Sequence, residues 1–146
     1  MPKFMKMLNN ISRSQAVFRN TKINTEDLQS SHYAFVLAIC RAPGRSQEDI
    51  ARELCINKST AARNINYLEE KGYVIRTAMP NDKRQFSVCP TKKMLDILPV
   101  VRNASGEWMR LLSEDIPAQE LEIFNSVLSR MEKKARSIIG KGDELK

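Results

Sequence analysis

Apolar residues recur every three or four positions through most of the chain, which is the spacing of amphipathic helices. Helical segments are predicted on this basis at residues 4–19, 32–40, 47–54, 58–71, 91–112 and 117–139. Ser30 or Ser31 can cap the second of them, which should stop before Pro43-Gly44. Pro99 should interrupt and kink the fifth of them, because proline lacks a backbone N–H and crowds the preceding turn. Residues 73–88 instead alternate, as strands do. The pattern therefore predicts a mainly α protein with one small β element.

Capping residues divide the middle of the chain into two short helices. Ser46 is followed three positions later by Asp49, which resembles a capping box in its shorter acidic form and opens a helix to about Leu54. Asn57 can accept a hydrogen bond from a backbone N–H of the next helix. That helix ends at Gly72, a residue type that takes a left-handed conformation without steric cost. Because almost no chain connects the two helices, the spacing predicts a helix-turn-helix.

The second of these helices has two distinct faces. At about 100° per residue, Ala61, Ile65 and Leu68 form one apolar stripe that we expect to be buried. The opposite side begins with small hydroxyl residues and continues with Arg and Asn, which suits insertion into a DNA major groove. An ordinary amphipathic surface helix is the alternative on periodicity alone. The candidate groove-facing residues are Ser59, Thr60, Arg63 and Asn66, and Lys58 is a candidate phosphate contact.

The alternating region predicts a β-hairpin directly after that helix. Residues 73–78 run outward, the chain turns through residues 79–84, and residues 85–88 return. A two-stranded unit after a recognition helix is a wing, and Lys83 and Arg84 are placed to meet phosphates or to enter a narrow minor groove. Asp82 can support the wing by a salt bridge to one of these cations or as part of an Asn-Asp turn. The sequence leaves both open.

Composition and charge agree with a DNA-binding interpretation. The 146 residues are 42% apolar, enough for one compact domain or a core with appended arms. The formal net charge is +7, and residues 56–93 hold eight Lys or Arg against three acidic residues. A concentrated basic region is typical of nucleic-acid binders, although many basic faces are simply solvated. No window is apolar enough to span a membrane, so we expect a cytoplasmic protein.

The residues needed for an enzyme or a metal site are scarce. His32 is the only histidine, and the three cysteines are widely spaced without a C-x-x-C, so neither a tightly bound metal nor a disulfide framework is expected. No phosphate-binding glycine loop, nucleophile motif or acid–base pair stands out. We therefore expect no enzyme activity and no cofactor. Cys40 and Cys55 are expected to be buried and inert, and Cys89 to be the most exposed of the three.

Together, the two-helix unit and the hairpin resemble the winged-helix core of the MarR (multiple-antibiotic-resistance regulator) family. The matching stretches are SHYAFVLAI and SQEDIARELCINKSTAARNINYLEEKGYVIRTAMPNDKRQFSVCPT. The shared features are an S-T pair near the start of the recognition helix, an L-E-x-K-G ending, an arginine and a D-x-R wing. Here these are Ser59-Thr60, Leu68-Glu69-Glu70-Lys71-Gly72, Arg76 and Asp82-Lys83-Arg84, and Leu98-Pro99, Glu107-Trp108 and residues 116–121 extend the likeness into the flanks.

Three residues depart from the family pattern. Met94 stands where a glycine is common, His32 where a glutamine is frequent, and Ile116 where a Ser or Thr cap is usual. None of them belongs to the groove-facing set, so the departures concern local helix geometry and leave the expected DNA binding intact.

The resemblance implies a mainly α fold with a small β-wing, in which a winged helix-turn-helix core carries N- and C-terminal dimerisation helices. The implied boundaries are residues 1–29, 30–90 and 91–146. Projecting helices cannot bury long apolar stripes alone, which independently favours a homodimer over an intramolecular bundle on a monomer. A two-fold dimer would place two recognition helices about 34 Å apart on double-stranded DNA, and hence on a pseudo-palindromic operator.

The resemblance further implies a repressor that responds to a small aromatic or anionic effector bound between the dimerisation helices and the winged helix. The candidate pocket residues near that junction are Phe18, His32, Tyr33 and Trp108, each of which is otherwise a core or rim residue. The rival function is a winged helix used for protein–protein contact. That rival predicts exposed apolar residues at the groove-facing positions, where this chain has polar ones.

Overall fold

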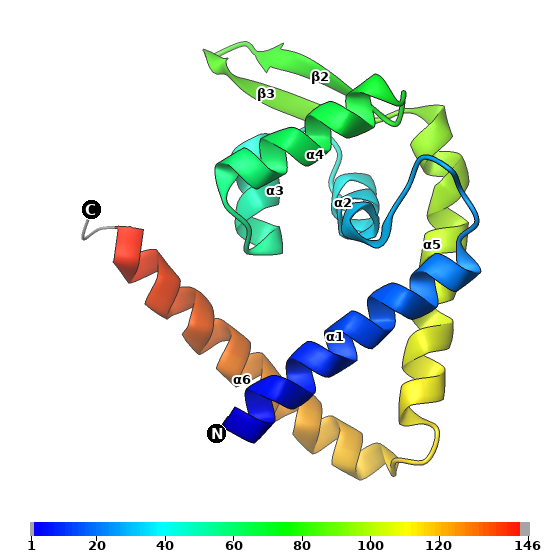
Figure 1. Ribbon diagram of the computed structural model, residues 1–146. Coiled ribbons are helices and arrows are strands. Elements are labelled where there is room, and N and C mark those ends of the chain that lie inside the picture. Colours follow the sequence, from blue (N-terminus) through cyan, green and yellow to red (C-terminus); the bar gives the residue numbers. More distant parts are fainter. Residues whose placement is uncertain (1, 144–146) are drawn as a thin grey trace. The chain divides into compact units, whose positions relative to one another are not determined.

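The computed structural model describes residues 2–143, and within them the chain forms six helices and a small antiparallel sheet (Figure 1). The mainly α fold with a β-wing is therefore confirmed. The elements, in chain order, are α1 (Pro2–Lys22), α2 (Ser30–Arg41), β1 (Arg45–Ser46), α3 (Gln47–Leu54), α4 (Lys58–Glu70), β2 (Val74–Met79), β3 (Asp82–Pro90), α5 (Lys92–Ser113) and α6 (Ala118–Asp143).

The chain divides into two compact units. The first, Met1–Trp108, contains the helices and strands from α1 to β3 and most of α5. The second, Met109–Lys146, contains the end of α5 and all of α6. No helix in the part of the chain that the structure describes is both long enough and apolar enough to cross a membrane.

The hydrophobic core of the first unit joins α2, α3, α4, the base of the hairpin and α5. The stripe predicted on α4 is confirmed, since Ala61, Ile65 and Leu68 are fully buried. Ile39 of α2 and Ile50 of α3 pack in the same cluster. Burial of each such Leu or Ile side chain stabilises the fold by roughly 1.5–3 kcal/mol. This packing fixes which face of α4 remains available to solvent.

The caps of the helix-turn-helix lie where the sequence predicts them. Ser46 Oγ accepts a hydrogen bond from the backbone N–H of Asp49 at 3.1 Å, and Asn57 Oδ1 accepts from that of Thr60 at 2.7 Å. Gly72 ends the second helix with φ +82°, a conformation that strains any residue with a Cβ. These local bonds set the start of α3 and both ends of α4.

Tertiary contacts change the cap expected for α2. Neither Ser30 nor Ser31 is the N-cap; Gln29 takes that position, and its backbone N–H donates to His32 Nδ1 at 3.0 Å. The prediction of a serine cap was wrong because His32 is held by burial and by stacking on Tyr67, with ring centroids 4.7 Å apart. The helix then ends at Arg41, before Pro43, as the sequence indicated.

The wing is a three-stranded antiparallel sheet in the order β1-β3-β2. The two-residue strand β1 was not predicted, since it exists only by pairing with β3. The hairpin strands are also longer than expected, so Lys83 and Arg84 lie at the start of β3 instead of in the turn. The register passes from Ala78 opposite Phe86 to Met79 opposite Asp82. Because of this irregularity, which resembles a β-bulge, the segment of β3 that carries both cations is not regularly paired with β2.

The helices at the two ends of the chain, α1, α5 and α6, form close to where the sequence predicts them. Helix α5 continues through Pro99, so the predicted interruption there is wrong, while the predicted kink stays a prediction. Within the first unit, α1 lies against α5: Arg19 Nη2 donates to Ser105 Oγ at 3.1 Å, and Lys22 Nζ pairs with Glu107 at 3.2 Å. In the second unit, α6 carries exposed apolar side chains at helical spacing, including Phe124, Met131 and Ile138.

Candidate nucleic-acid interface

The solvent-facing side of α4 carries the predicted groove residues. Ser59, Arg63 and Asn66 are exposed and Thr60 is half-buried, on the side opposite the buried stripe. Ser59 Oγ donates to the capping Asn57 Oδ1 at 2.9 Å, and Arg63 Nη2 lies 3.4 Å from Thr60 Oγ1. A bond of that length is weak. The Arg63 guanidinium can therefore exchange this contact for another acceptor at little cost.

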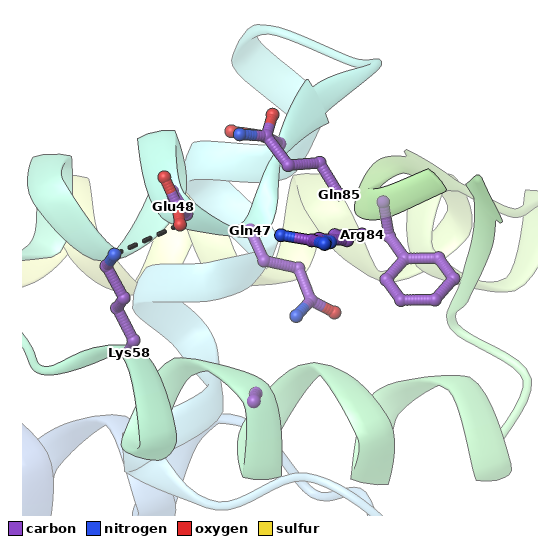
Figure 2. A pocket seen from close by; sticks show the side chains of 8 residues that line it. Gln47, Glu48, Lys58, Arg84 and Gln85 are labelled. Carbon is purple, nitrogen blue, oxygen red and sulfur yellow. Dashed lines mark ion pairs between the residues drawn. The ribbon is translucent and has the colours of Figure 1, made fainter. Parts of the chain in front are cut away.

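Lys58 borders a hollow between the start of α3, the first turns of α4 and the beginning of β3 (Figure 2). Its Nζ forms an ion pair with Glu48 at 3.1 Å, and the lysine side chain is 78% exposed. The volume of the hollow, about 190 Å³, is smaller than the roughly 300–1,000 Å³ of pockets that enclose drug-sized ligands. The residues that line it are Ser46, Gln47, Glu48, Lys58, Ala62, Arg84, Gln85 and Phe86.

One of the two wing cations lies beside the same hollow. Lys83 and Arg84 are both exposed, and Arg84 borders the hollow together with Lys58. The small Ala62 of α4 also lines the hollow. The first turns of α4 and the start of β3 therefore border one hollow, to which Lys58 and Arg84 contribute positive charge and Glu48 contributes a carboxylate.

Asp82 supports the wing through the backbone. Its Oδ1 accepts a hydrogen bond from the N–H of Arg84 at 3.0 Å. Within residues 2–143, the structure shows no ion pair from Asp82 to Lys83 or Arg84. Of the two interpretations open from the sequence, the geometry is that of a turn in which the aspartate side chain bonds the backbone two residues on. The side chains of both cations remain available.

Arg76 is the residue of this surface whose role the sequence did not reveal. Its side chain is only 20% exposed and pairs with Glu69 at 3.0 Å, and its other donors reach Gln47 Oε1 at 3.1 Å and Asn66 Oδ1 at 2.9 Å. The hydrogen bonds from Arg76 hold the pKa of the Glu69 carboxyl below its ordinary value. The residue thus ties β2 to both helices of the helix-turn-helix.

The four residues predicted for an effector pocket divide into two pairs. Phe18 and Trp108 touch, with ring centroids 5.4 Å apart, where α1 meets α5. Tyr33 is fully buried in the core, and buried His32 caps α2 and stacks on Tyr67. Desolvation lowers the pKa of His32 from its ordinary value. Neither His32 nor Tyr33 therefore presents its ring to solvent.

Arg19 lies close to the first of these pairs and was not singled out from the sequence. It is half-buried, and its Nε has no hydrogen-bond partner in the described structure. Burial lowers the pKa of the Arg19 guanidinium, and the neighbouring Tyr33 partly opposes this shift. An orphaned, half-buried guanidinium donor is a suitable partner for an anion.

The cysteines differ from expectation. Cys55 is exposed, because it occupies the left-handed position with φ 54° that joins α3 to the turn. Cys40 and Cys89 are both half-buried, so Cys89 is not the most exposed of the three. Desolvation raises the pKa of the Cys40 thiol, which keeps it protonated and unreactive. Over the described residues, no group of three or more His, Cys, Asp or Glu side chains is arranged to hold a metal ion.

Comparison with known proteins places this geometry in a family. The model of the MarR family matches residues 26–85, which include the whole helix-turn-helix and most of the hairpin. The HTH-type transcriptional regulator YybA of Bacillus subtilis (strain 168) is 25% identical over 84% of this chain and 82% of its own length.

Solved structures agree over nearly the whole chain. A MarR transcriptional regulator from Methanosarcina mazei Go1 superimposes with a TM-score of 0.83 at 27% identity, over 93% of this chain and 99% of that one. A MarR family regulator from Listeria monocytogenes, complexed with 26mer DNA, gives a TM-score of 0.85 at 20% identity, over 91% and 89% of the two chains. The matching proteins are transcriptional regulators and not enzymes. The helix-turn-helix and most of the wing of this chain therefore match the MarR family of transcriptional regulators, and the chain shares the winged-helix fold of the solved members of that family.

Proposed function

We propose that this regulator binds a pseudo-palindromic operator as a homodimer, with α4 in the major groove and the wing against the neighbouring backbone or minor groove. In this proposal Ser59, Thr60, Arg63 and Asn66 face base edges. Lys58, Lys83 and Arg84 contact phosphates or enter the minor groove, and Asp82 holds the wing turn. The DNA complex of the Listeria relative supports the mode of binding at the level of the fold.

One observation carries the assignment. Lys58, the cation at the start of α4, and the wing cation Arg84 border the same hollow, and the other lining residue from α4 is the small Ala62. A slim helix start flanked by cations allows a phosphate backbone to approach closely while the exposed Arg63 reaches toward the groove floor. A surface evolved for protein contact would instead expose apolar residues on α4, where Ser59 and Asn66 are exposed.

The test is to measure, by fluorescence anisotropy, the affinity of the protein for random-sequence duplex DNA at a series of salt concentrations. The proposal predicts a steep linear fall of log affinity with log salt concentration, since each neutralised phosphate releases condensed counterions. Binding that is absent or insensitive to salt would contradict it and favour the protein-partner alternative.

The proposals of a homodimer and of a chain in three parts depend on the helices at its two ends. Residues 1–29 and 91–146 are proposed to be the dimerisation helices around the winged core at residues 30–90. Exposed apolar side chains support this assignment: Met7 and Ile11 of α1 are 53% and 40% exposed, and Phe124 and Ile138 of α6 are 50% and 63% exposed. Burying such stripes against a second copy removes apolar surface from water at both arms.

We also propose that the regulator is a repressor released by a small aromatic or anionic effector. The support is Arg19, whose buried Nε lacks a partner beside the aromatic pair Phe18 and Trp108. Such a ligand acts only through different affinities for the DNA-competent and DNA-incompetent arrangements of the dimer. Benzoate-class acids should therefore weaken operator binding in the wild type and have less effect on Arg19→Gln. An equal response of the two proteins would exclude Arg19 from the effector site.

A further inference from the structure

The hollow between the start of α3, the first turns of α4 and the beginning of β3 contains a polar side chain to which the proposed function gives no role. Gln47, the first residue of α3, extends into this hollow and lines it together with Lys58 and Arg84 (Figure 2). Its amide oxygen Oε1 accepts a hydrogen bond from Arg76 Nη1 at 3.1 Å. Within residues 2–143, the structure shows no acceptor for the amide nitrogen Nε2 of Gln47. Gln47 therefore has N–H donors available to a ligand.

Arg76 determines which end of the Gln47 amide is available. A guanidinium carries donors and no acceptor, so the amide atom that bonds to it is the oxygen. The side chain of Arg76 is only 20% exposed and is paired with Glu69 at 3.0 Å, which holds it in place. The amide nitrogen of Gln47 consequently points away from Arg76. The oxygens of a DNA phosphate accept hydrogen bonds, and glutamine side chains are among their usual donors.

The hollow lies where a DNA strand is expected to pass. In the proposed function, α4 occupies a major groove and the wing contacts the neighbouring backbone or minor groove. One sugar–phosphate strand separates these two grooves, and the hollow is bordered by residues of both α4 and β3. On α4, the bordering residue Ala62 directly precedes the groove-facing Arg63 and lies one turn before Asn66. In this arrangement the strand between the two grooves crosses the hollow.

The charged residues of the hollow favour an anion. Lys58 and Arg84 contribute two cations against the single carboxylate of Glu48. Glu48 Oε1 pairs with Lys58 Nζ at 3.1 Å, and both side chains are exposed. Exposed ion pairs of this kind contribute little to stability, so a phosphate can draw Lys58 away from Glu48. Because this exchange reduces the net contribution of Lys58, a neutral donor such as Gln47 adds to the contact without breaking an ion pair.

We infer that the hollow seats one backbone phosphate of the strand between the two grooves, and that Gln47 donates to this phosphate beside Lys58. Arg76 is the positioning residue of the contact, because it holds the amide oxygen of Gln47. The inference rests on the proposed function, since it requires α4 to lie in the major groove. A neutral side chain neutralises no phosphate and releases no condensed counterion, so Gln47 contributes affinity without contributing to the salt slope.

The experiment uses the operator that the wild-type protein selects from a pool of random duplexes. Each backbone phosphate is replaced in turn by an uncharged methylphosphonate, and affinities are measured by anisotropy for the wild type, Gln47→Met and Lys58→Ala. One phosphate in each half-site should be coupled to both residues, so that its replacement weakens the wild type and weakens each variant much less. On the unmodified operator, Gln47→Met should bind roughly fivefold to tenfold more weakly per bound copy, the value of one hydrogen bond, with an unchanged salt slope.

Gln47→Glu separates a phosphate contact from a structural role. The carboxylate keeps an acceptor for Arg76, so a residue that only supports Arg76 should tolerate this change at least as well as Gln47→Met. A residue that donates to phosphate should not, because glutamate lacks the donors and repels the anion. Gln47→Glu should therefore bind the operator more weakly than Gln47→Met, and much of this difference should disappear when the seated phosphate is a methylphosphonate.

Gln119→Glu is the matched control, because it adds the same charge on α6, outside the proposed DNA interface. Its molar mass is measured alongside its affinity, since α6 is a proposed dimerisation helix. Its operator affinity should fall less than that of Gln47→Glu, and no single methylphosphonate should restore it.

The outcomes distinguish the inference from the proposed function. The inference is overturned, while operator binding stands, if Gln47→Met binds as well as the wild type or if Gln47 and Lys58 are coupled to different phosphates. It is also overturned if Gln47→Glu binds the operator as well as Gln47→Met or no worse than Gln119→Glu. If Gln47→Met does not fold, the comparison of Gln47→Glu with Gln119→Glu on the modified operators decides. A wild type that enriches no duplex and binds random DNA without salt dependence refutes the proposed function itself.

Discussion

At the scale of single residues, the side chains of the interface differ in how firmly they are held. Arg63 is exposed and its contact to Thr60 is long, at 3.4 Å, so it is available to a base edge. Lys58 is paired with Glu48 at 3.1 Å, and a phosphate must compete with that carboxylate for it. Lys83 is exposed on the irregular start of β3. Base selection and phosphate attraction are therefore assigned to different residues, which substitutions can separate.

Replacement of Arg63 should affect discrimination between sequences. We predict that Arg63→Ala lowers the ratio of specific to random-duplex affinity by roughly 1–3 kcal/mol, the value of a bidentate contact to guanine. The measurement is anisotropy on the selected operator and on random duplex at one salt concentration. Arg130→Ala on α6 is the control, since Arg130 lies outside the proposed DNA interface. Because α6 is also a proposed dimerisation helix, the molar mass of this variant is measured alongside its affinity. An unchanged ratio in Arg63→Ala would show that Arg63 does not read a base.

Replacement of Lys83 should affect all sequences alike. We predict that Lys83→Ala weakens binding to operator and random duplex by the same factor and flattens the slope of log affinity against log salt by about one unit. The matched control is Lys133→Ala, which removes one exposed cation from α6 and whose molar mass is checked because α6 is a proposed dimerisation helix. If both lysine variants changed the slope equally, the effect would reflect net charge and the wing assignment would fail.

At the scale of the elements, local signals were enough to predict some parts of the structure and not others. Ser46 and Asn57 cap their helices through bonds three residues away, so short-range chemistry predicts them. Strand β1 depends on pairing with β3, more than forty positions along the chain, as Ser46 opposite Ser87 shows. No local pattern could predict that strand. The exposure of Cys55 follows from the left-handed turn it occupies, where a glycine would have been the usual signal.

The candidate site also has parts that local sequence signals predict and parts that they do not. Periodicity identified the exposed face of α4, because the buried stripe opposite it is set by helical spacing. The Arg76 cluster joins residues of α3, α4 and β2, and its geometry is created by the packing of the wing against the helices. The sequence contained the arginine as a family feature and gave no indication of its partners.

The start of α2 should make stability depend on pH. His32 is buried, its Nδ1 accepts the Gln29 N–H, and desolvation lowers its pKa below the ordinary value. The unfolded chain therefore binds a proton more readily than the native state does, so this contribution is present above about pH 6.5 and is lost as the pH falls below it. We predict a smaller free energy of unfolding at about pH 5.5 than at about pH 7.5, measured by urea denaturation.

His32→Gln provides the control for that measurement. The glutamine oxygen can accept the same N–H without titrating, and His32 is the only histidine in the chain. The difference in stability between the two pH values should therefore shrink in His32→Gln. A pH dependence that is identical in the two proteins would assign it to other groups.

At the scale of the whole molecule, the account requires two copies. A single winged helix presents one α4 and one pair of wing cations, which covers one half-site. The exposed apolar stripes on α1 and α6 are the surfaces that we propose join the copies. Two-fold symmetry then requires that each half-site be read in the opposite direction, and that the spacing between them match the repeat of the double helix.

Selection of bound duplexes from a random pool, with the molar mass of the complex measured on the enriched sequence, tests this claim most directly. The account predicts an inverted repeat whose half-sites lie about 10 base pairs apart, centre to centre, bound by two copies of the chain. Enrichment of a single unrepeated motif bound by one copy, or half-sites in direct orientation, would contradict it.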